Sequence, residues 1–96
     1  MDRIDVELKG ETDEGLLFNV EVNARGSLTE HEVTLKQEDY QRLVPEGEIT
    51  PQELVEESFR FLLKRESNQS ILGKFNLMDI SDYFPEYEEE ISSQVN

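Results

Sequence analysis

The sequence contains no cysteine, a single histidine, and only 9 basic side chains against 23 acidic ones. Without cysteine the chain can form no disulfide, no thiolate zinc site and no thiol nucleophile. That absence fits a reducing compartment, and we expect a cytoplasmic protein. No apolar run approaches the roughly 18 residues needed to span a bilayer, and we expect no signal peptide from the charged, alternating start of the chain.

Basic residues are so few that the formal net charge is −14. Nucleic-acid backbones are bound by Lys and Arg that displace counterions, so we expect no nucleic-acid binding. The charge also argues against binding to an anionic membrane surface. It favours solubility and would favour a basic partner, although a solvated acidic coat is the simpler explanation.

Several motifs of catalysis and ligand binding are missing. The chain has no G-x-x-x-x-G-K-[ST], no G-x-G-x-x-G and no G-x-S-x-G. The oxygen-rich run at 13–15 does not continue with the spacing of an EF-hand loop. We therefore expect no cofactor, no dedicated metal site and no enzymatic activity.

The first third of the chain alternates between apolar and polar residues, which is typical of half-buried strands. In the last of these runs, His31, Val33 and Leu35 share the apolar face. Short connections rich in turn-forming residues separate the runs, which predicts a three-stranded antiparallel meander with one solvated face. The predicted strands cover about residues 3–9, 16–23 and 28–35.

The strongest helix signal covers residues 51–65. Thr50 and Glu53 have the spacing of a capping box, and Pro51 falls at the first helical position. Apolar side chains then recur with a helical period and predict a wide buried face. Further predicted helices cover about 37–44, 70–75, 77–84 and 85–92. Packing these helices on the meander gives a single α+β domain of two layers over residues 1–96.

Three segments of the chain resemble a family of small bacterial proteins of unknown function. They are HEVTL at 31–35, TPQELVEESFRFLLKRESNQSIL at 50–72 and DISDYFPEYEEEI at 79–91. The resemblance covers about His31 to Ile91. The family carries no assigned activity, so the resemblance implies no catalytic residue.

Two sets of residues could in principle support acid–base chemistry. His31 is an intrinsic candidate for a general base or a metal ligand. Its alternation with Val33 and Leu35 favours a structural histidine at the inner face of the sheet instead. Carboxylates are abundant, but they fall mostly on predicted wet faces, which favours solvated charge over a catalytic pair.

The C-terminal stretch at 82–91 is the clearest candidate for contact with a partner. Aromatic residues among acidic ones are typical of protein interfaces. We expect a partner to contact Tyr83, Tyr87, Glu88, Glu89 and Glu90. The alternative is that this stretch closes the core and leaves the tyrosine hydroxyls exposed.

Three functions are compatible with these observations. The leading hypothesis is a non-enzymatic module that binds another protein, basic in character, or a second copy of itself. The second is an acidic inhibitor that mimics nucleic acid and occupies a basic site on its target. The third is an enzyme that uses carboxylates and His31.

Overall fold

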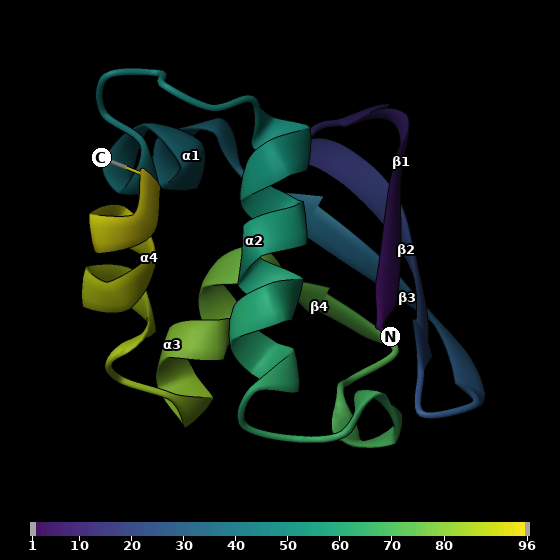
Figure 1. The fold of residues 1–96 in the computed structure, drawn as a ribbon. Helices are drawn as coiled ribbons and strands as arrows, with labels where there is room; N and C mark the ends of the chain where they lie inside the picture. Colours follow the sequence, from purple (N-terminus) through teal and green to yellow (C-terminus); the bar gives the residue numbers. More distant parts are fainter. Residues whose placement is uncertain (1, 96) are drawn as a thin grey trace.

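The sheet contains one strand more than the sequence predicts. In the computed structural model, which describes residues 2–95, β1, β2 and β3 form an antiparallel meander and β4 joins β3 in parallel. The strand order is β1-β2-β3-β4, so the sheet is mixed (Figure 1). The strands cover Arg3–Thr12, Gly15–Ala24, Ser27–Leu35 and Lys74–Asn76. The α+β class is confirmed, and the strand count of three is wrong.

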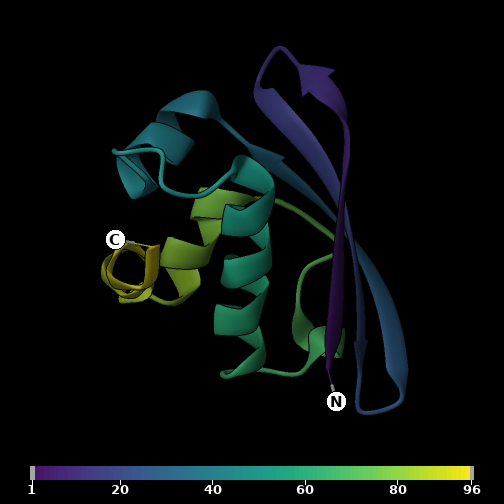
Figure 2. The same ribbon diagram turned by 45° about the horizontal axis from the view of Figure 1, so that its top comes forward.

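Alternation along the strands sorts the side chains between an inner and an outer face. Val20 on β2 pairs with Val6 on β1 and with His31 on β3, and Phe18 pairs with Val33. All of these except Val6 are buried, and Val6 packs against the core from the edge strand. The helices lie on the inner side of the sheet (Figure 2).

The helix predicted at 70–75 is wrong. A 3-10 turn, η1, covers Asn68–Ser70, and the chain then runs extended into β4. The Glu32 amide donates to the Gly73 carbonyl at 2.8 Å, and Phe75 lies opposite Val33 and is buried. The edge of β3 thus supplies hydrogen-bond partners for the backbone of this segment and a buried position for Phe75. These tertiary contacts stabilise the extended conformation more than the weak local helix preference stabilises a helix.

The remaining helical segments differ from the predicted ranges mainly at their ends. They are α1 at Gln37–Leu43, α2 at Pro51–Leu63, the 3-10 turn η2 at Leu77–Asp79, α3 at Ile80–Tyr83 and α4 at Tyr87–Val95. The capping box of α2 is confirmed, because the Glu53 amide donates to Thr50 Oγ1 at 3.1 Å and the Thr50 amide donates to Glu53 Oε1 at 2.9 Å. Within residues 2–95, no helix combines the length and the apolar character needed to cross a membrane.

Helix α2 is buried along two sides. On the side of the sheet, the Phe59 ring lies 5.4 Å from His31 and 6.0 Å from Phe75, measured between ring centroids. On the other side, the Phe61 ring meets Phe84 at 6.0 Å and Tyr87 at 5.2 Å, both edge-on. The helix therefore joins the sheet to α3 and α4, and its position fixes theirs.

Candidate functional site

The residues expected to contact a partner do not share one surface. Tyr83 is 66% exposed, whereas Tyr87 is 0% exposed. The Tyr87 hydroxyl donates to Ser58 Oγ at 2.7 Å, because the Ser58 hydroxyl itself donates to the Leu54 carbonyl at 2.8 Å. Burial raises the pKa of the Tyr87 phenol. The expected exposure of Tyr87 is therefore wrong, since its ring and its hydroxyl both belong to the core.

Two of the three expected glutamates make ion pairs within the chain. Glu88 accepts both Nε and Nη2 of Arg42, and Glu90 accepts Nη2 of Arg65 at 2.7 Å. Glu89 is exposed and lies outside these pairs. The acidic run of α4 is thus partly neutralised by cations of α1 and of the segment after α2.

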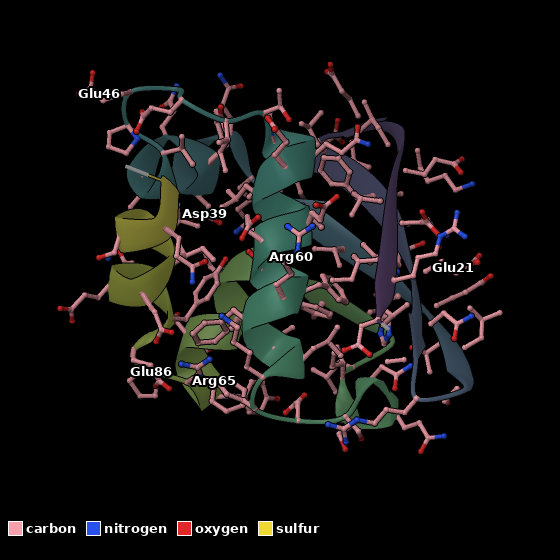
Figure 3. The ribbon with its side chains drawn as sticks, viewed as in Figure 1. Glu21, Asp39, Glu46, Arg60, Arg65 and Glu86 are labelled. Carbon is pink, nitrogen blue, oxygen red and sulfur yellow. The ribbon has the colours of Figure 1, made fainter. Side chains whose placement is uncertain are left out.

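Arg65 is the centre of this neutralisation. Its guanidinium lies 3.6 Å from the centroid of the Phe61 ring, and its Nη1 donates to the Phe61 carbonyl at 3.1 Å. Its Nε donates to Glu86 at 3.1 Å, and Figure 3 shows the two side chains close together. A hydrogen bond from the backbone amide of Glu86 and the contact with Arg65 lower the pKa of the Glu86 carboxyl. Arg65 therefore ties the start of α4 to the end of α2.

A groove lies beside this anchor, at the C-terminal end of α2. It has a volume of about 100 Å³ and is formed by the end of α2, the chain from Ser70 to Phe75, and α3. Figure 1 places these segments at the same end of the molecule. The floor is apolar and includes Ile71 and Phe75, while Leu72 and Tyr83 at its rim are 48% and 66% exposed. Its volume is below the roughly 300 Å³ typical of small-molecule sites, so it suits a single inserted side chain.

The walls of the groove carry charge of one sign. Glu66 and Asp79 both line it, and no Lys, Arg or His does so among the described residues. Asp79 accepts a hydrogen bond from the Asn76 amide through Oδ2 at 3.1 Å. Burial raises the pKa of the Glu66 carboxyl, with no cation contributing an opposite effect. The groove is therefore apolar at its floor and anionic at its wall.

His31 is fully engaged inside the protein. Its Nδ1 lies 2.8 Å from the Leu72 carbonyl, which can only accept, so this nitrogen carries the hydrogen. The side-chain amide of Asn68 donates through Nδ2 to Thr29 Oγ1 at 3.1 Å. The Thr29 hydroxyl is therefore left to donate its own hydrogen to Nε2 of His31 at 2.8 Å. The Asn68 nitrogen is identified by its 2.9 Å bond to the Ser27 carbonyl. This network holds the loop bearing Leu72 against β3.

A second, more polar hollow lies at the β1–β2 turn. It measures about 460 Å³ and is lined by Asp13, Glu14, Gln37 and Tyr40, among others. No group of three or more His, Cys, Asp or Glu side chains within residues 2–95 has a geometry that could hold a metal ion. The oxygen-rich run at 13–15 therefore stays without a metal-binding arrangement in the described chain.

The outer face of the sheet carries a row of carboxylates. Asp5, Glu21 and Glu30 are direct neighbours across β1, β2 and β3. Figure 3 shows Glu21 on the side of the sheet away from the helices. Arg3 contacts Asp5 at 3.1 Å at one end of the row. Like charges placed directly opposite destabilise a sheet, so this arrangement carries an energetic cost.

The comparisons with known proteins add no family or relative. No model of a protein family matches the chain, and no curated protein and no solved structure shows a significant similarity to it.

Sequence reasoning did not find the groove. Glu66 falls in a stretch predicted as a loop after the helix at 51–65, and Leu72 falls in the short helix predicted at 70–75. Their proximity to Tyr83 depends on the path of the chain through β4. The adjacent apolar pair Ile71 and Leu72 would have signalled an exposed side chain if this segment had been predicted as extended, since neighbouring residues of an extended segment face opposite sides.

We predict that Thr29→Val destabilises the protein by about 1–3 kcal/mol, because Nε2 of His31 and the Asn68 amide both lose a buried partner. Thr29→Ser keeps the hydroxyl and should cost far less. Urea titration of both variants measures the difference in the free energy of unfolding. Equal losses in the two variants would show that the network does not depend on the hydroxyl.

We predict that Glu66→Gln stabilises the protein at neutral pH. The folded-state pKa of Glu66 is raised above the ordinary 4.5, so its ionised form costs stability at pH values above that pKa. The advantage of the variant should shrink as the pH falls through the folded-state pKa and vanish where the unfolded carboxyl is also protonated. Denaturant titrations of both proteins across this pH range measure the difference in their free energies of unfolding. A variant that is less stable at pH 7 contradicts the assignment.

Proposed function

We propose that the chain is a non-enzymatic cytoplasmic module that binds another protein through the end of the molecule where α2, α3 and the η1–β4 loop meet. The observation that carries this proposal is the groove, in which Leu72 and Tyr83 expose large apolar surface beside the carboxylates of Glu66 and Asp79 that line it. Exposed aromatic and aliphatic side chains around a pocket are typical anchors of protein interfaces.

The arrangement of the domain supports a rigid binding surface. We take the helices and the sheet as two layers, because the buried side chains of β2 and β3 face α2. The rim residue Leu72 is held by the bond from His31 to its carbonyl, and Tyr83 belongs to α3. A surface held in this way loses little conformational entropy when a partner binds.

Fewer residues of the stretch at 82–91 contact the partner in this proposal than the sequence predicts. Tyr83 remains a contact at the groove, and Glu89 is accessible but does not line the groove, whereas Tyr87 supports the surface from the core. Glu88 and Glu90 could bind cations of a partner only by giving up their ion pairs with Arg42 and Arg65, so these contacts would add little binding free energy.

The row of Asp5, Glu21 and Glu30 favours a second candidate, an acidic mimic of nucleic acid that occupies a basic site. A costly row of like charges on an exposed face is understandable if a basic partner neutralises it. A captured partner that binds DNA and this chain at the same time excludes the candidate. An enzyme using His31 is less well supported, because both ring nitrogens are already bonded.

We predict that the immobilised chain captures a protein partner from a lysate of its source organism and that purified partner rebinds. Retention should be stronger at low salt than at high salt, because acidic side chains contribute. The double variant Leu72→Ala/Tyr83→Ala should lose the partner, since both exposed apolar side chains are removed. Leu28→Ala is the control, because the 60% exposure of Leu28 lies between those of Leu72 and Tyr83, but Leu28 lies on β3 outside the groove. No partner at low salt, or equal capture by the double variant and wild type, contradicts the proposal.

A further inference from the structure

The size and the charge of the groove at the end of α2 both limit which ligand can bind there. Its volume of about 100 Å³ accepts one side chain rather than a cofactor, and its exposed rim residues Leu72 and Tyr83 can cover only a narrow ligand. A short extended segment that inserts a single apolar anchor fits within this limit on size.

The second limit on the ligand is the negative charge of the groove. Glu66 is partly buried in the wall, and among the described residues its carboxylate makes none of the ion pairs that hold Glu86, Glu88 and Glu90. Asp79 adds a second carboxylate, of which Oδ2 accepts from a backbone amide. A carboxylate that is partly removed from water and has no cationic partner is stabilised in its charged form when a Lys or Arg of the ligand binds beside it.

The surroundings of Arg65 show one way in which this protein binds a cationic side chain. There a guanidinium lies over the Phe61 ring while donating to two glutamates. The groove offers similar groups, because Tyr83, Glu66 and Asp79 all line it, but no Lys or Arg among the described residues does so. Aromatic faces and carboxylates together favour a basic side chain of a ligand.

We propose that the groove binds a short linear segment of a partner protein that carries one large apolar residue close to a Lys or Arg. This inference rests on the proposed function and adds the chemistry of the recognised segment. The apolar residue enters the hollow between Ile71 and Phe75, and the basic residue binds Glu66 beside Tyr83. Asp79 adds a second negative charge to the lining of the groove.

The test begins with selection of displayed random 12-residue peptides on the immobilised full-length chain. Wild-type protein should enrich peptides with one large apolar residue and a Lys or Arg within a few positions. The double variant Leu72→Ala/Tyr83→Ala should not enrich them. An enriched motif without a basic residue, or the same enrichment on the double variant, overturns the proposal.

A selected peptide then allows a quantitative comparison by fluorescence anisotropy. Glu66→Gln should weaken its affinity by about fivefold, because one partly buried ion pair is lost. Glu89→Gln removes the same charge outside the groove and should change the affinity less than about twofold. Tyr83→Ala should weaken it by about tenfold or more. Replacing the basic residue of the peptide by Ala should remove the difference between wild type and Glu66→Gln. Equal effects of Glu66→Gln and Glu89→Gln contradict the assignment of Glu66.

The results separate this inference from the proposed function. If no peptide is enriched but a captured partner depends on Tyr83, the partner binds as a folded surface, so the linear segment is wrong and the proposed function stands. If sedimentation shows a dimer of the chain that Tyr83→Ala dissociates, a second copy fills the groove and the linear segment is again wrong. If neither peptide nor partner binds, both proposals fail.

Discussion

The structure depends on the burial of α2 along two sides. Phe59 packs against His31 and Phe75 of the sheet, while Phe61 and Ser58 hold Tyr87 on the opposite side. A helix that faced only the sheet would leave α3 and α4 with little to pack on, because both are short. Since most helix stability in proteins comes from tertiary packing, these short helices owe their position to α2.

The same constraint produces the candidate site. After α2 the chain turns through η1 and returns as β4, and α3 then packs back toward the helix end. Arg65 and His31 fix the two flanks of this path, one through Glu86 and Glu90 and the other through the Leu72 carbonyl. The groove is what remains between these fixed segments, which explains why apolar and acidic side chains meet there.

The sequence predicts the local elements better than their junctions. Capping at Thr50 and alternation in the first third depend on neighbours in the chain, and the structure contains both features, although the register of β1 shifts between Leu8 and Gly10. The strand at Lys74–Asn76 depends on the distant edge of β3, and the burial of Tyr87 depends on Ser58. Composition correctly marked 82–91 as rich in aromatic and acidic residues, but it could not distinguish core Tyr87 from exposed Tyr83. The groove combines several such distant contacts and so had no local signature.

Native-state hydrogen exchange measured by NMR tests the central role of α2 most directly. The account predicts that the amides from Ser58 to Leu62 exchange only through global unfolding, with protection equal to that of the buried β2 strand around Val20. The amides of Glu66 and Leu72 should exchange faster, because Glu66 lies just beyond the last residue of α2 and Leu72 lies in a loop. If the α2 amides instead open locally at a much lower free energy than β2, the helix does not hold the domain together, and the groove beside it is not a preformed site.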